Sequence, residues 1–351
     1  MEMSRIEEVD TNFKVNPSIG KADVKFYDVL EEPFAVYGVF YEDGQYRRLP
    51  EAVARATSEG VLELHHHTAG GRVRFRTDSP YVAMHADMPE MSLMAHFPYS
   101  GSAGFDLYET INGEERYIRT FVPGLECKEG YEGVIELGEG MHEVTIHFPL
   151  YSPVSALYIG LSETAQVFSP KPYIDRKPIV YYGSSITQGG CASRPGNAYE
   201  NILTRRLRWD HVNLGFSGSA KAEDAMIDYV ASLDMSVFVY DYDHNAPTVE
   251  HLRNTHEKMF KKVRAAHPDI PVVMMTRPKF YPNAEELERA AIIRTTYRNA
   301  LEAGDRNVYL LTGPELMALA REEGTVDNCH PTDFGFMSMA AALEPLLAKL
   351  R

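Results

Sequence analysis

Alternating apolar and polar residues divide the first half of the chain into short β segments. The clearest run is Arg72–Arg76, in which arginines flank Val73 and Phe75, and such alternation is typical of an antiparallel strand with one buried face. Turn signals such as Asn112-Gly113 separate the runs. We predict strands over residues 34–41, 61–67, 72–76, 81–86, 105–111, 116–121, 133–137, 143–148 and 157–161. The pattern predicts a β-sandwich, jelly-roll-like, over residues 1–165.

The pattern changes after residues 163–177, a proline-containing stretch with little periodicity that we interpret as the connection between two domains. From residue 173 to residue 351, short apolar runs alternate with windows of helical periodicity. We predict strands over 179–182, 211–214, 237–240, 272–275 and 308–311, and helices near 197–208, 222–231, 248–266, 284–303 and 332–350. This order indicates a parallel sheet with helices on both faces, in which binding sites form at the carboxyl ends of the strands.

Composition limits the kinds of partner that we expect. The 351 residues carry 35 lysines and arginines against 50 acidic residues, a formal net charge of −15, which disfavours nucleic acid and anionic membranes as partners. Neither a signal peptide nor an apolar run of membrane-spanning length is evident. We therefore expect a cytoplasmic protein without membrane or nucleic-acid partners, and homo-oligomers remain open.

The cysteines and a histidine run give no metal or disulfide signal. Cys127, Cys191 and Cys329 are few and odd in number, which fits a reducing compartment. On the predicted strand over 61–67 only His65 and His67 share a face, and no third ligand is evident. No metal site is therefore predicted.

The first candidate for chemistry is a serine in a turn between a strand and a helix. The segment Gly183-Ser184-Ser185 directly follows the first parallel strand, and such a turn exposes a hydroxyl beside backbone N–H groups that can receive negative charge. A turn of this kind also binds phosphate or merely redirects the chain. Cys191 lies further along the same loop, away from the apex of the turn, which disfavours it as a nucleophile.

A second candidate lies before the last predicted helix. Asp327 and His330 are three residues apart in a loop, and a carboxylate that orients a histidine makes a base able to activate a serine hydroxyl. The alternative is that Thr332 or Asp333 caps the helix and His330 is a surface residue. Both roles can be present in this segment, with Thr332 or Asp333 as the helix cap and His330 as the base.

The second half resembles the SGNH (GDSL-like) hydrolase superfamily in four ordered blocks. The first block resembles Gly183-Ser184-Ser185-Ile186-Thr187, with Ser184 in place of the usual aspartate, and the fourth resembles Asp327-Asn328-Cys329-His330-Pro331. The resemblance implies a flavodoxin-like three-layer α/β/α domain with a five-stranded parallel sheet. It also implies Ser185, His330 and Asp327 as catalytic residues, and no cofactor.

The middle two blocks supply the oxyanion donors that the resemblance implies. Asn213-Leu214-Gly215-Phe216-Ser217-Gly218 matches the second block, so the N–H of Gly218 would join that of Ser185, with Gly215 as the competing assignment. Asn245, in a third block that lacks the usual glycine, would add its side-chain amide. Its alternative role is to cap the helix entered at Pro247.

The first half resembles an N-terminal β-domain of one SGNH subgroup through Gly104-Phe105-Asp106-Leu107-Tyr108. Asp106 and Tyr108 share a strand face that either reaches the catalytic pocket or packs between the domains. Arg277, at the end of the fourth parallel strand, either binds a substrate carboxylate or pairs with an acidic residue.

These observations together predict a serine esterase. By analogy with related enzymes, we expect a small-molecule or oligosaccharide ester as substrate, with a small acyl group, acetyl in the first instance, on a carbohydrate. Two alternatives stay open: an acyltransferase that uses the same triad, and a non-catalytic carbohydrate-binding protein.

Overall fold

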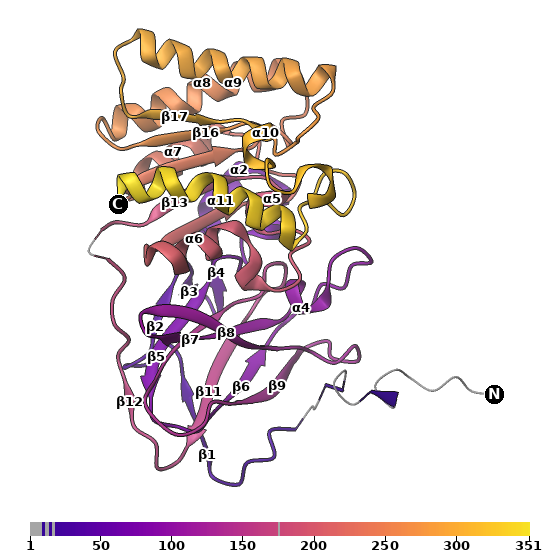
Figure 1. Ribbon diagram of the computed structural model, residues 1–351, viewed down its shortest axis with the longest axis vertical. Coiled ribbons are helices and arrows are strands. Elements are labelled where there is room, and N and C mark those ends of the chain that lie inside the picture. Colours follow the sequence, from indigo (N-terminus) through magenta and orange to yellow (C-terminus); the bar gives the residue numbers. More distant parts are fainter. Residues whose placement is uncertain (1–8, 11–13, 16–17, 175) are drawn as a thin grey trace, which may run out of the picture.

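The computed structural model describes residues 9–10, 14–15, 18–174 and 176–351, which form an antiparallel β domain and an α/β domain (Figure 1). The predicted fold class is confirmed. No helix of the described residues is both long and apolar enough to cross a membrane.

Two antiparallel sheets face each other in the N-terminal domain and enclose one hydrophobic core. The first sheet has the order β1 (Val24–Asp28), β11 (Ala156–Ser162), β6 (Tyr81–Asp87) and β9 (Gly130–Glu136). The second has the order β12 (Val167–Phe168), β5 (Arg72–Thr77), β10 (His142–His147), β7 (Phe105–Ile111) and β8 (Glu114–Phe121), with β2 (Ala35–Tyr37) also paired to β5. A small hairpin of β3 (Phe40–Glu42) and β4 (Gln45–Arg47) completes the strands of this half.

Strand β5 is buried on both faces, although its alternation predicts one exposed face. Val73 and Phe75 point into the sandwich core, as expected. Arg72 and Arg74 are also buried, at 0% and 1% exposure, because the α/β domain and the connection cover that side: Arg72 pairs with Asp210, and Arg74 lies over the ring of Tyr173. Alternation thus places the charged face correctly but cannot show that another domain covers it.

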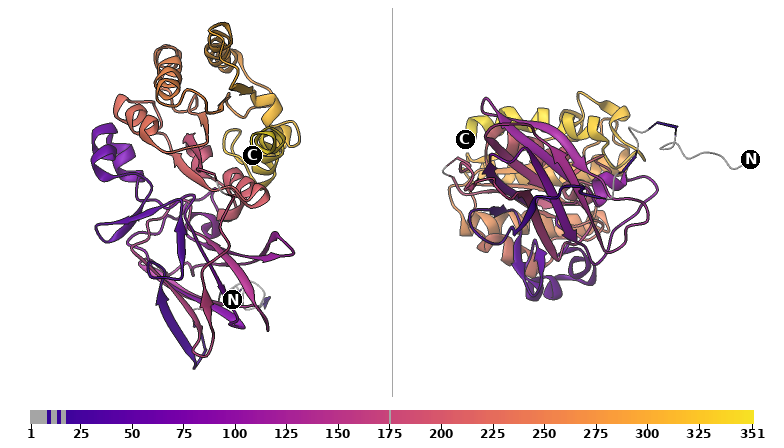
Figure 2. Two further views of the ribbon diagram at one scale, coloured as in Figure 1. Left: turned by 90° about the vertical axis from the view of Figure 1, so that its left-hand side faces the viewer. Right: turned by 90° about the horizontal axis from the view of Figure 1, so that it is seen from below.

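The strand predicted over residues 61–67 is wrong, because residues 61–64 are helical and residues 65–66 form a turn. Helices α2 (Glu51–Thr57) and α3 (Glu59–Leu64) occupy the region, and Ser58 caps α3 by accepting a hydrogen bond from the N–H of Val61. Ala54 and Val61 bury themselves in a core of the α/β domain. Figure 2 shows these purple helices beside the α/β domain, away from the sandwich sheets.

The α/β domain is a five-stranded parallel sheet in the flavodoxin-like order β14 (His211–Gly215), β13 (Ile179–Gly183), β15 (Val237–Asp241), β16 (Val272–Met275) and β17 (Val308–Leu311). Alternate strand residues enter two separate cores. One core lies under α7 (Asp224–Ser232), α8 (Val249–Ala266) and α9 (Ala284–Glu302), and the other lies under α6 (Tyr199–Leu207) and α11 (Asp333–Leu350). The sheet is therefore the middle of three layers. Short helices α4 (Tyr99–Ser102), α5 (Ser185–Gln188) and α10 (Gly313–Leu316), with 3₁₀ turns at Pro195–Asn197 and Arg321–Gly324, join the longer elements.

Strand order places the site. In this topology the chain leaves the two neighbouring strands β13 and β15 in opposite directions, which opens a crevice at their carboxyl ends. Strand β13 ends at Gly183, and Gly183 lies opposite Asp241 at the end of β15. The turn that carries Ser185 begins at this crevice.

Candidate active site

A tight turn between β13 and α5 presents Ser185. Ser184 is the N-cap of α5, and its side chain accepts a hydrogen bond from the N–H of Ile186, so the serine that replaces the usual aspartate has a structural task. Gly183 allows the close approach, because a Cβ there would lie 2.2 Å from both Asp241 Oδ1 and Thr187 Oγ1. Ser185 is 7% exposed, and its N–H belongs to the first helical turn, which has no partner within the helix.

Ser185, His330 and Asp327 form one continuous hydrogen-bonded chain. Ser185 Oγ lies 2.8 Å from His330 Nε2, and His330 Nδ1 lies 2.7 Å from Asp327 Oδ2. With Nδ1–H donating to the carboxylate, Nε2 holds the lone pair that faces the serine hydroxyl. The structure thus brings the three predicted catalytic residues together from opposite ends of the domain.

The loop over residues 325–331, which carries His330, is a closed turn that holds the Asp327 carboxylate in place. An isolated β-bridge joins Thr325 to Pro331, and the backbone N–H groups of Cys329 and His330 donate to Asp327 Oδ1 at 3.0 and 2.7 Å. Partial burial acts to raise the pKa of Asp327, but the hydrogen bonds from His330 and the backbone outweigh it and bring this pKa to about 2. Asp327 is therefore a carboxylate at neutral pH.

The loop after β14 has one unengaged glycine N–H, that of Gly218. Gly215, the competing assignment, ends β14, and its N–H donates to Asn213 Oδ1 at 2.9 Å. Gly218 has a left-handed backbone, with φ of +67°, and its N–H donates to no described residue. The N–H of its neighbour Ser217 binds Gln188 Oε1, which ties this loop to the nucleophile turn.

Asn245 does not cap α8. Thr248 is the N-cap and accepts from the N–H of His251 at 3.0 Å, so the capping alternative is wrong. Asn245 Oδ1 instead accepts from the N–H of Ala220 at 3.3 Å, which turns the carbonyl end of the amide toward the Gly218 loop. The Nδ2 group has no partner among the described residues and stays available as a donor.

The β domain contributes directly to the nucleophile turn. The hydroxyl of Tyr151 donates to the carbonyl oxygen of Ser185 at 3.2 Å, and Gln188 Nε2 reaches Leu150 O and His67 Nδ1, each at 3.2 Å. His67 therefore packs between the domains, and His65 binds Arg47 and the carbonyl of Leu62 instead. The sequence gives no signal for the contacts of Tyr151 and Gln188, because they join segments far apart in the chain.

Asp106 and Tyr108 meet the loop that follows the nucleophile. Asp106 is fully buried, and its carboxylate accepts from Thr120 Oγ1, Arg194 Nη1 and the N–H of Gly196. Tyr108 also receives a hydrogen bond from Arg194. The sequence left two roles open for Asp106 and Tyr108, reaching the catalytic pocket or packing between the domains. These contacts are those of packing between the domains.

Arg277 is surrounded by acids. Its Nη1 lies 3.1 Å from Glu286 Oε1, and its backbone N–H donates to Asp243 Oδ2 at 3.1 Å. It lines a small cavity of about 170 Å³ to which none of the three triad residues contributes. The pairing with acidic residues accounts for the position of Arg277, and the structure shows no contact between it and the triad.

Sequence reasoning missed His96, which the β domain places beside the base. His96 is exposed, and its ring centroid lies 6.2 Å from that of His330. Cys191 also approaches this point, but burial raises the pKa of its thiol to about 12, which keeps it protonated and unfit as the nucleophile.

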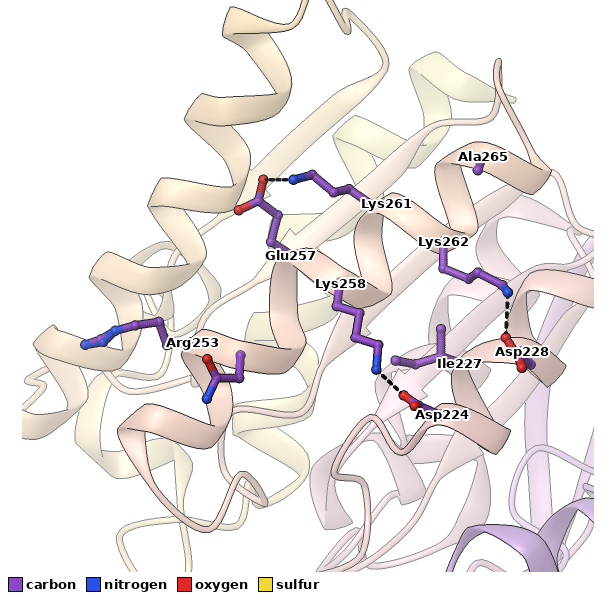
Figure 3. Close-up of a pocket in the computed structure, with 10 residues that line it drawn as sticks. Asp224, Ile227, Asp228, Arg253, Glu257, Lys258, Lys261, Lys262 and Ala265 are labelled. Carbon is purple, nitrogen blue, oxygen red and sulfur yellow. Dashed lines mark hydrogen bonds and ion pairs between the residues drawn. The ribbon is translucent and has the colours of Figure 1, made fainter.

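A large hollow lies away from the triad. A depression of about 790 Å³ runs between α7 and α8, and charged pairs such as Lys258–Asp224 and Lys262–Asp228 cross it (Figure 3). Its cations are paired with neighbouring acids and it contains no residue of the triad, so its size does not make it the active site.

Comparison with known proteins gives two family matches that follow the two halves of the chain. The model of the GDSL-like lipase/acylhydrolase family matches residues 176–348, and the model of the N-terminus of SGNH hydrolase-type esterases, GxDLY, matches residues 24–167. No curated protein matches the chain.

Solved structures of the same architecture cover nearly the whole chain. A putative GDSL-like lipase from Bacteroides ovatus is 26% identical, with a TM-score of 0.84 over 93% of this chain and 98% of its own. A salicylyl-acyltransferase from a tetracycline biosynthetic pathway is 18% identical (TM-score 0.76, 94% and 98% covered), and a family two carbohydrate esterase from Cellvibrio japonicus is 13% identical (0.61, 93% and 98%). The last two likenesses show a shared fold. The four blocks, the triad geometry and the two family matches together show that residues 176–348 form a GDSL-like lipase/acylhydrolase domain of the SGNH hydrolases, preceded by a GxDLY N-terminal domain over residues 24–167.

Proposed function

We propose that the protein is a serine esterase in which Ser185 attacks an ester carbonyl. The observation that carries this proposal is the hydrogen-bonded chain from Ser185 Oγ through His330 to Asp327. A serine hydroxyl is a weak nucleophile until a neighbouring base removes its proton, and a carboxylate holds that base in the required tautomer. A non-catalytic binding protein would have no need for this arrangement.

The reaction proceeds through an acyl-enzyme. As Ser185 Oγ bonds to the acyl carbon, its proton moves to His330 Nε2. The negative charge on the carbonyl oxygen is met by the N–H groups of Ser185 and Gly218 and by the amide of Asn245. The bond to the alcohol then breaks, His330 returns the proton to the leaving oxygen, and water repeats the sequence to release the acid.

We further propose a small acyl group, acetyl in the first instance, on a carbohydrate as the substrate. The solved neighbours include carbohydrate esterases, which supports the substrate class by fold analogy. In addition, the His330 and Asp327 side chains are 25% and 37% exposed, so a bulky polar alcohol can reach the base without entering a deep cavity.

The test is an assay of p-nitrophenyl esters of increasing chain length, followed by acetylated sugars. Ser185→Ala and His330→Ala should each lower kcat by on the order of 10³ or more, and the double variant should be scarcely worse, because either change disables the same unit. Asp327→Asn should cost less, since the histidine remains. Ser232→Ala, an exposed serine on α7, is the matched control. Wild-type turnover by Ser185→Ala would refute the proposal.

A second arm separates hydrolysis from acyl transfer. The same triad can pass the acyl group to an alcohol instead of water, and a solved neighbour is an acyltransferase. Product analysis with added sugar alcohols distinguishes the two reactions. We expect free acid as the main product, and an acceptor-dependent ester formed with slow hydrolysis would assign the transferase activity instead.

A further inference from the structure

Three side chains of types that bind metal ions converge around His330. His96 comes from the segment between β6 and α4, Cys191 follows α5, and His330 is the base itself. One ligand atom of each lies within 4.8 Å of the other two. These three residues bring no carboxylate to the group, and they come from three separate parts of the chain.

The donor set matches one class of metal ion. Two imidazoles and a thiolate are ligands of Zn²⁺ and similar borderline ions, whereas Mg²⁺ and Ca²⁺ require oxygen ligands. Because Zn–N and Zn–S bonds are about 2.1 and 2.3 Å, donors around a tetrahedral zinc lie roughly 3.4–3.8 Å apart. The cluster therefore needs to contract by about 1 Å, and the exposed His96 side chain has the freedom to move inward.

A supporting partner for a metal-bound histidine is already in place. Histidine ligands in metal sites commonly donate their second ring N–H to a carboxylate, which fixes the orientation of the ring. Asp327 holds His330 in this way through Nδ1 at 2.7 Å, which leaves Nε2, the atom 2.8 Å from Ser185 Oγ, as the ring nitrogen available to a metal. Gly190 packs close by, because a Cβ on it would lie 3.4 Å from the Cδ2 atom of His330, and this places the Cys191 loop on the Nε2 side of the ring.

We propose that this cluster is an inhibitory zinc site, formed by His96, the Cys191 thiolate and His330 Nε2, with water or Ser185 Oγ in the fourth position. On binding, the Cys191 thiol releases its proton to solvent and His330 gives its Nε2 lone pair to the metal. That lone pair is the one needed to accept the proton of Ser185. Zinc and catalysis therefore exclude each other, and the β domain, through His96, controls the affinity.

The binding test does not depend on the proposed esterase function. Chelator-treated full-length protein is titrated with Co²⁺, and thiolate-to-cobalt absorption in the near ultraviolet is recorded, with Zn²⁺ added afterwards as competitor. We expect one equivalent to bind with this absorption. Cys191→Ser should abolish the absorption, His96→Ala should weaken binding at least tenfold, and Cys329→Ser, the neighbouring thiol, should change neither. Unchanged absorption in Cys191→Ser, or no binding by the wild type, would overturn the site.

The inhibition test rests on the proposed esterase function. Zn²⁺ should inhibit hydrolysis of p-nitrophenyl acetate, Mg²⁺ should not, and a chelator should restore the full rate. Measured against its own metal-free rate, each of His96→Ala and Cys191→Ser should need at least tenfold more zinc for half-inhibition. Equal zinc sensitivity in wild type and both variants would overturn the inhibitory role. If no ester were hydrolysed, the esterase function would fail while the cobalt result still decided the metal site.

Discussion

At the scale of single residues, Asp241 lies beside the turn that carries Ser185 and makes the stability of the fold depend on pH. It ends β15 directly beside Gly183, and it accepts a hydrogen bond from Thr187 at 2.8 Å, while its second oxygen has no partner among the described residues. Burial, the main cause, raises the pKa of Asp241 from 3.8 to about 7. The folded protein therefore favours the neutral acid at this position.

This raised pKa gives a pH dependence with a definite sign. Because the folded pKa lies above the unfolded one, the stabilisation is complete below about pH 4 and is lost as the pH rises through about 7. Asp241→Asn should remove this contribution, at most roughly 4 kcal/mol, so its free energy of unfolding should fall less than that of wild type across this window. Urea unfolding at several pH values measures it, with the exposed Asp269→Asn as control. Parallel curves for wild type and Asp241→Asn would contradict the account.

At the scale of elements, the start of α11 secures the loop that follows the nucleophile. Asp333 Oδ1 accepts from the N–H of Ser193 at 2.8 Å, and Oδ2 accepts from the Ser193 hydroxyl. Asp333 lies three residues beyond His330, so the start of α11 ties the Ser185–Ser193 segment to the loop that carries His330.

The substitution Asp333→Asn should therefore have a large effect on kcat and only a small effect on the free energy of unfolding. The amide retains one acceptor and loses the other, which costs about 1 kcal/mol of stability, whereas a small displacement between base and nucleophile costs about tenfold in rate. Steady-state kinetics and thermal unfolding separate the two effects. Asp305→Asn, which weakens the hydrogen bond from Arg264 far from the site, should lower stability without lowering kcat. A rate loss of the same size in both variants would contradict this positioning role.

Helices and strands could be predicted where a local sequence pattern determines them. They could not be predicted where packing against the other domain determines the secondary structure. The helices near 248–266 and 284–303 appear as Val249–Ala266 and Ala284–Glu302, because their caps and periodicity are local features. Residues 61–67 were predicted as a strand, yet burial of Val61 against the α/β core favours the helix α3. Likewise the triad blocks were visible in the sequence, whereas His96, Tyr151 and Gln188 join the site only through long-range packing.

At the scale of the whole molecule, the β domain packs against the segments of the α/β domain that carry the candidate site. Arg48, fully buried, donates to the carbonyls of Gly215 and His67, each at 2.6 Å, and lies over the ring of Phe216. Together with the Tyr151 contact to Ser185, it connects the first half of the chain to the end of β14 and to the turn after β13.

A chain that begins near Tyr173 should therefore be poorly soluble and inactive. It would lose the contacts of Arg48 and Tyr151, and Arg194 would lose its partners Asp106 and Tyr108. It would also expose the core surface that α2 and α3 cover. Expression, gel filtration and hydrolysis of p-nitrophenyl acetate check this. A soluble, monomeric and fully active fragment would show that the β domain is dispensable.

The central claim is that Ser185 is the nucleophile and His330 its base, and a serine-directed phosphonate tests it most directly. After the full-length protein reacts with the reagent, peptide mass spectrometry locates the adduct. The account predicts a single label on Ser185, greatly slowed labelling in His330→Ala, and none in Ser185→Ala. A label on Ser184 or Cys191, or equally fast labelling without His330, would contradict it.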